Sequence, residues 1–115
     1  MKKALLVVFL VGTGMLSGCA TRASSIAPVS ISAGEYSGLT CVEARGQLQT
    51  SRETQIALTR RQNNAATADA ASVFLFLLPL GSVFGADVAG ELAQAKGEVL
   101  ALERHLRGSC SAGQP

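Results

Sequence analysis

The sequence offers few of the residues from which enzymes and metal sites are usually built. It contains one histidine, three cysteines and no tryptophan among 115 residues. A metal centre needs three or four convergent ligands, and acid–base catalysis needs titratable groups that meet at one place. The single histidine, His105, lies between Arg104 and Leu106, and we interpret it as a surface residue in the last turn of a helix. The sequence therefore predicts no enzyme, with no catalytic residue, metal, cofactor or small-molecule substrate.

Aromatic residues and long β-branched runs are also scarce, which bears on the fold class. Aromatic side chains make up 4% of the chain, and its apolar character comes mainly from alanine, leucine, valine and glycine. Strands favour β-branched and aromatic residues, whereas small side chains allow helices to approach closely. We therefore predict an all-α protein.

A basic start and a short apolar run open the chain. The uncharged stretch over residues 4–18 has the order of a secretory signal peptide and is shorter than the ~20 residues of a transmembrane helix. The tetrapeptide at 16–19, Leu-Ser-Gly-Cys, resembles a bacterial lipobox. The resemblance implies that residues 1–18 are removed and that Cys19 becomes the mature N-terminus, carrying acyl chains such as palmitate.

The lipobox resemblance also implies where the protein resides. Two or more acyl chains form a stable membrane anchor, because each buried CH₂ contributes ~0.8 kcal/mol. Ala20 follows the cysteine, and the absence of aspartate there implies the periplasmic face of the outer membrane in a Gram-negative host. Once Lys2 and Lys3 are removed, eight basic residues balance eight acidic ones. No basic surface is expected, so we predict that the protein does not bind nucleic acid. The acyl chains predict a membrane as its partner.

Residues 19–38 separate the anchor from the part of the chain with helical patterns. They are rich in serine, alanine, threonine, glycine and proline, which is the composition of a flexible linker. We predict a lipidated N-terminus with a flexible tether over 19–38, a folded region over 39–110 and a polar tail over 111–115.

The folded region begins with a helical pattern over about 41–78. Thr40 and Glu43 have the spacing of a capping box at its start, and Pro79 ends it because proline disfavours helix in the residue before it. Positions three and four residues apart define the face we expect to be buried. They are Ile56, Thr59, Asn63, Ala66, Ala70, Val73 and Leu77.

A second helical pattern, over about 83–107, is more regular and should end at Gly108. Its apolar seam has the spacing of a coiled coil and consists of Val88, Leu92, Ala95, Val99, Leu102 and Leu106. A parallel stripe of small residues, where another helix could come close, consists of Ala86, Gly90, Ala93, Gly97 and Ala101. Together the two patterns predict an antiparallel two-helix hairpin with a Pro/Gly tip.

The tip of this hairpin is strongly apolar. No charged residue occurs from Ala70 to Ala86, although turns between helices in water usually carry polar residues. Large apolar side chains gathered at one place must be covered by something. A bilayer and an oligomer core remain equally open as the cover. The residues expected to make this contact are Phe74, Phe76, Leu77, Leu80 and Phe84.

Two cysteines remain once Cys19 is assigned to the lipid. Cys41 and Cys110 lie near the two ends of the hairpin region, where antiparallel helices would bring them within reach of each other. An exported protein meets an oxidising environment, which favours a disulfide. We prefer a bond within one chain, with an intermolecular bond or free thiols as alternatives.

The layout as a whole resembles small bacterial lipoproteins of unknown function, with a helical hairpin, an apolar Pro-containing turn and a terminal cysteine. The resemblance rests on the Tyr36-Ser37 pair before Cys41, on Pro79 and on Cys110, and it implies no activity. We expect a non-enzymatic cell-envelope lipoprotein whose tip engages the membrane or self-assembles. The alternative is an accessory subunit of an envelope transport, secretion or conjugation complex, which would dock its apolar seam on a partner helix.

Overall fold

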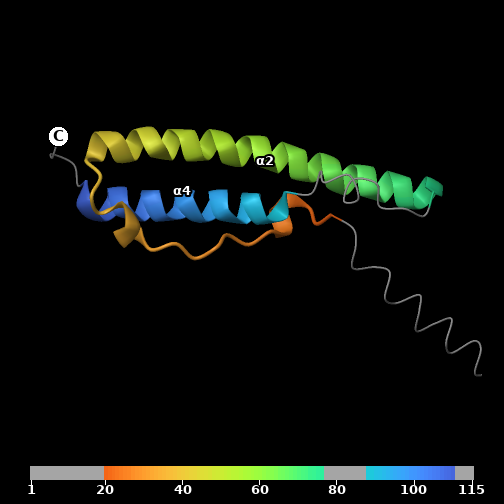
Figure 1. Cartoon of the computed structure of the whole chain (residues 1–115), viewed down its shortest axis with the longest axis horizontal. Helices are drawn as coiled ribbons and strands as arrows, with labels where there is room; N and C mark the ends of the chain where they lie inside the picture. Colours follow the sequence, from red (N-terminus) through yellow and green to blue (C-terminus); the bar gives the residue numbers. More distant parts are fainter. Residues whose placement is uncertain (1–19, 77–87, 111–115) are drawn as a thin grey trace, which may run out of the picture.

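Two long antiparallel helices form the body of the protein (Figure 1). The computed structural model describes residues 20–76 and 88–110. Helix α2 spans Cys41–Phe76 and helix α4 spans Ala89–Ser109. Two short 3₁₀ turns precede them, η2 at Ala23–Ser25 and η3 at Ala33–Tyr36. These ranges contain no strand, and the predicted all-α hairpin is confirmed.

The helix boundaries differ from the expected ones at both ends of α4. The expected start near residue 83 lies outside the described residues, and α4 as described begins after Val88. At its other end, Gly108 lies inside the helix rather than ending it. The amide of Cys110 donates to the carbonyl of Leu106 at 3.0 Å, so helical hydrogen bonding continues up to the cysteine that is bonded to Cys41.

The start of α2 is closed by the predicted capping box. The Glu43 carboxylate accepts hydrogen bonds from the Thr40 hydroxyl at 2.7 Å and from the Thr40 amide at 2.9 Å. In return, the Glu43 amide donates to Thr40 Oγ1 at 3.3 Å. The hydroxyl bond and then the amide bond favour the charged carboxylate, and they hold the pKa of Glu43 below its ordinary value of 4.5.

Glu43→Gln should weaken the pH dependence of stability without removing the cap. A lowered folded pKa contributes stability that is present above the ordinary value of 4.5 and lost as the pH falls through the folded value. Thermal melting followed by circular dichroism should therefore show a smaller loss on acidification for Glu43→Gln than for the unaltered chain. Glu53→Gln, on the exposed side of the same helix, controls for the loss of a carboxylate. Identical acid profiles for Glu43→Gln and the unaltered chain would contradict the capping role.

The apolar core lies between the two helices and follows the predicted seam of α4. Val99 and Leu102 of the seam pack with Ala44 and Leu48 of α2, and Leu106 lies partly buried beside them. The seam positions Val88, Leu92 and Ala95 are also buried. The seam is thus covered by α2 of the same chain, and it is not available to a partner helix while the hairpin is closed.

The buried face of α2 lies one position away from the expected face. Ile56, expected to be inside, is 53% exposed, and Ala70 is exposed as well. The buried residues lie three or four positions apart along the helix, apart from one gap of eleven and from Ala66, which adjoins Ala65. The later ones are polar or alanine. The buried residues are Ala44, Leu48, Ser51, Gln62, Ala65, Ala66, Asp69 and Ser72, and of these Ala66 was expected to be buried. A search for apolar spacing selects the wrong face because the inner side of this helix carries polar groups with partners.

The segment expected to be a flexible tether is part of the fold. Residues 20–38 run along α4 from its first turns toward its last turns, with η2 and η3 packed on the hairpin (Figure 1). Ala20 and Ala23 are buried, and Tyr36 packs on the core cluster. The prediction of a free linker was wrong because the hairpin supplies partners for the backbone groups of this segment, as described below.

Candidate functional site

The N-terminal segment is held on α2 by buried polar side chains. Asp69, which has no exposed surface, accepts a hydrogen bond from the amide of Ala20 at 2.6 Å. One turn and a half earlier along α2, Asn63 Oδ1 accepts from the amide of Ala23 at 3.0 Å. These bonds fix the chain at Ala20, the residue that follows the predicted lipidation site, and at Ala23.

Gln62 connects three parts of the structure and is completely buried. Its amide nitrogen donates to the carbonyl of Thr21 at 2.7 Å, and its amide oxygen accepts from the amide of Val88 at 2.7 Å. The side chain thus joins the N-terminal segment to the residue that precedes α4. A buried amide costs free energy unless it is paired, and the partners of Gln62 explain why a glutamine occupies this position.

Helix α4 holds the same segment from its other side. Lys96 Nζ donates to the carbonyls of Ala23 at 2.6 Å and Ile26 at 2.7 Å, the first residue of η2 and the residue that follows it. The amide of Val29 donates to the carbonyl of Ala93 at 3.0 Å. The segment therefore lies against both helices, with its backbone groups paired to each.

Gly97 allows this close approach. A Cβ atom at position 97 would lie 2.5 Å from the carbonyl oxygen of Val29 and 2.8 Å from its Cγ2. The sequence predicted a stripe of small residues for another helix, and Gly97 does lie under a neighbour. That neighbour is the extended chain around Val29 and Ile31, not a helix. Of the other stripe positions, Gly90 is exposed and Ala86 lies outside the described residues.

The predicted anchor and tip residues fall largely at the edge of what the structure describes. Cys19, Leu77, Leu80 and Phe84 lie outside the described residues, and Phe74 and Phe76 belong to the end of α2. Their described neighbours are informative. Ala20, next to Cys19, packs with Ala65 and Ala66 toward that same end of α2, and Leu75 in its last turn is 67% exposed.

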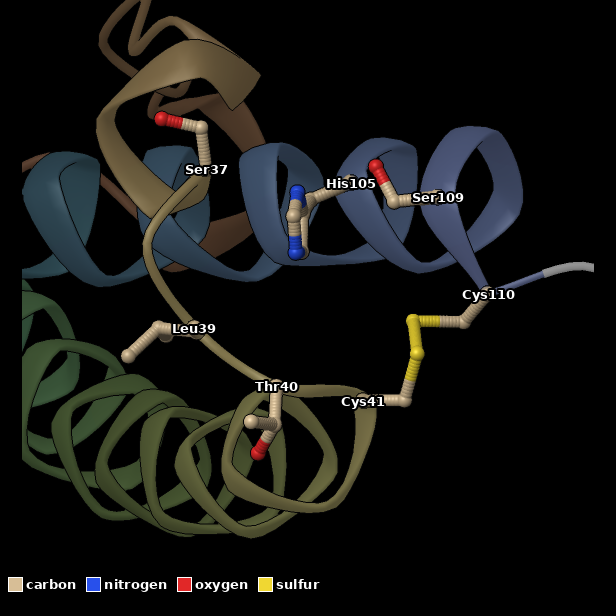
Figure 2. Close-up of a pocket in the computed structure, with 7 residues that line it drawn as sticks. All are labelled: Ser37, Leu39, Thr40, Cys41, His105, Ser109 and Cys110. Atoms are coloured by element: carbon tan, nitrogen blue, oxygen red, sulfur yellow. A yellow bond between two sulfur atoms is a disulfide. The ribbon is translucent and has the colours of Figure 1, made fainter. Parts of the chain in front are cut away.

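The opposite end of the hairpin is closed by the disulfide. Cys41 at the start of α2 and Cys110 directly after α4 are bonded, with their Cα atoms 5.7 Å apart. The bond within one chain, which we preferred from the sequence, is confirmed. The linker from η3, the start of α2 and the last turns of α4 border an open pocket of about 490 Å³ next to it (Figure 2). The pocket is lined by Ser37, Leu39, Thr40, Cys41, His105, Ser109 and Cys110.

His105 is buried, contrary to the prediction of a surface histidine. Only 6% of its surface is exposed, and its Nε2 atom has no hydrogen-bond partner among the described residues. Figure 2 shows the ring between α4 and the linker that carries Leu39 and Thr40. The prediction failed because η3 and this linker fold back over the end of α4. No acid–base partner accompanies the ring in the pocket, and its two cysteines are consumed in the disulfide.

The charged groups between the helices make surface contacts. Arg52 of α2 pairs with Glu103 of α4 at 2.8 Å, and the hydroxyl of Ser51 donates to Glu98 at 3.4 Å. Exposed pairs of this kind contribute about 0–1 kcal/mol. Burial, and then the nearby carboxylates of Glu98 and Glu35, raise the pKa of the Tyr36 phenol above its ordinary value of 10.0.

Comparison with known proteins provides no relative that assigns a role to these features. No protein-family model matches the chain, and neither a curated protein nor a solved structure is significantly similar to it. Among the described residues, no helix is both long and apolar enough to span a membrane. In the same part of the chain, no three side chains of the metal-binding types gather at one place.

Proposed function

We propose that this protein is a non-enzymatic, lipid-anchored protein of the bacterial cell envelope. In this proposal residues 1–18 direct export and are removed, and Cys19 carries the acyl chains. The mature chain lies on the periplasmic face of the outer membrane, where its helical hairpin serves as a structural or binding module at the membrane surface.

The observation that carries the proposal is the position of Ala20. This residue follows Cys19, the predicted mature N-terminus, and it is buried and bonded to Asp69. Thr21 and Ala23 are bonded to the helices as well, through Gln62 and Lys96, so the start of the proposed mature chain is held at several points. The bond to Asp69 would therefore hold the mature chain at the residue next to the lipidated Cys19.

The disulfide supports the same compartment. Stable structural disulfides form in oxidising environments, such as the bacterial periplasm, and are rare in the reducing cytosol. The bond between Cys41 and Cys110 closes the hairpin at the end away from Ala20. An exported chain is the setting in which this bond persists.

Cys19→Ser should abolish lipidation and processing. The intact mass of the unaltered protein, purified from bacterial membranes, should correspond to a chain that starts at Cys19 and carries acyl groups. The serine variant should retain residues 1–18 and lack the acyl mass. Cys110→Ser, which removes a cysteine elsewhere, should keep the lipid. An unaltered protein that retains Met1, or that starts at Cys19 without acyl mass, would refute the anchor.

A further inference from the structure

The structure fixes the end of the hairpin from which the N-terminal anchor leaves. Asp69, which holds the amide of Ala20, lies seven residues before Phe76 at the end of α2. That separation corresponds to about 10 Å along the helix axis, whereas Cys41 at the other end lies about 40 Å away. Ala20 therefore lies near the end of α2 and is remote from the disulfide.

The packing of residues 20–26 on the helices prevents the free movement that a flexible tether would allow. A flexible chain over residues 19–38 would have an end-to-end distance of roughly 25 Å and would let the hairpin turn freely. Instead, Asp69, Gln62 and Lys96 hold the backbone from Ala20 to Ile26 on the two helices. A lipid on the preceding residue consequently brings the end of α2 to the bilayer surface.

The last turn of α2 exposes a large apolar side chain, and the sequence around it carries no charge. Leu75 is 67% exposed, and the sequence has no charged residue from Ala70 to Ala86. No lysine or arginine occurs between Arg61 and Lys96, so attraction to anionic headgroups is not the basis of the contact. The nearest apolar phase to this end is the bilayer that holds the acyl chains.

We propose that the end of α2 enters the same bilayer leaflet as the Cys19 lipid, so that the hairpin stands on the membrane with its disulfide end directed away. This inference rests on the proposed lipidation and selects a lipid surface, rather than a second copy of the chain, as the cover for the exposed Leu75 at the end of α2. Val42 and Leu75 are separated by about 50 Å along α2. In this orientation Leu75 lies within the bilayer and Val42 lies far from it.

Single tryptophans can test this orientation, since the chain contains none of its own. Leu75→Trp and Val42→Trp replace two large apolar residues of the same helix that are almost equally exposed, at 67% and 69%. Each full-length lipidated variant is reconstituted into phosphatidylcholine vesicles whose acyl chains are brominated. Leu75→Trp should shift its emission to the blue and lose most of its intensity relative to unbrominated vesicles. Val42→Trp should keep both its wavelength and its intensity.

Other outcomes separate the alternatives. Quenching of both tryptophans would mean that the hairpin lies flat on the membrane, and quenching of neither would mean that the tip stays out of it. A blue-shifted but unquenched Leu75→Trp would assign the tip to a second protein copy. Each of these outcomes overturns the inference about orientation. The proposed function is tested separately, by measuring the acyl mass of the same samples, and it stands if that mass is present. If the chain carries no acyl mass, the proposed function fails, and the quenching of Leu75→Trp alone then decides whether the tip contacts the bilayer.

Discussion

Replacing Cys41 and Cys110 together by serine should lower the free energy of unfolding by about 4 kcal/mol. The disulfide joins residues 69 positions apart, and in the unfolded chain it therefore closes a long loop and removes much of the conformational freedom. A loss of this size is severe here, because small domains are stable by only about 5–15 kcal/mol in total. The core also buries little apolar side-chain volume, because alanines occupy many of its buried positions.

Urea unfolding followed by circular dichroism measures this effect, and reduction of the unaltered protein provides its control. A reducing agent should shift the unfolding midpoint of the unaltered chain to that of the double variant, and it should leave the double variant unchanged. Serine is a suitable replacement because both cysteines are partly exposed, so no polar group becomes buried. A double variant as stable as the oxidised protein would show that the core alone holds the hairpin closed.

Local regularities in the sequence predicted much of the hairpin. The seam of α4 repeats every three or four residues with large apolar side chains, and its burial against α2 follows from that pattern alone. The capping box of Thr40 and Glu43 depends on two residues three positions apart, so no tertiary information is needed to find it. The pairing of Cys41 with Cys110 followed from helix lengths and from the number of cysteines.

The inner face of α2 was missed because its residue types resemble those of a solvent-exposed face. Gln62 and Asp69 are buried, yet a count of apolar spacing places them outside. Their partners are the backbone groups of Ala20, Thr21 and Val88, which lie at least 26 residues away in the sequence. Side chains that serve distant backbone groups leave no local pattern, and the tether was misjudged for the same reason.

The candidate anchoring site was predicted only in part. The lipobox is a contiguous motif, so Cys19 could be singled out from the sequence. The position of that cysteine relative to the tip depends on the bond between Ala20 and Asp69, which joins residues 49 apart. Gly97 gave one clue, because a glycine within a helix often marks a close approach, but the approaching segment could not be identified from it.

Gly97→Ala should lower the free energy of unfolding by about 2–3 kcal/mol and loosen the N-terminal segment. The new methyl group would lie 2.5 Å from the backbone oxygen of Val29, and a backbone atom cannot move without taking its neighbours along. The bond from Val29 to Ala93 would stretch or break. Alanine gains up to about 1 kcal/mol over glycine in a helix, and this gain offsets only part of the loss.

Gly46→Ala is the matched control for this change, because it puts the same methyl group into the interior of α2 with nothing within 4 Å. It should raise stability by about 0.5–1 kcal/mol, through helix propensity alone. Limited trypsin digestion at the exposed Arg22 distinguishes the two variants further. Cleavage there should accelerate in Gly97→Ala, whose segment is displaced from Lys96, and should stay unchanged in Gly46→Ala. Equal stability and equal digestion in both variants would mean that the N-terminal segment does not pack on Gly97. The lipid-bearing N-terminus could then move relative to the hairpin, as the flexible-tether prediction assumed.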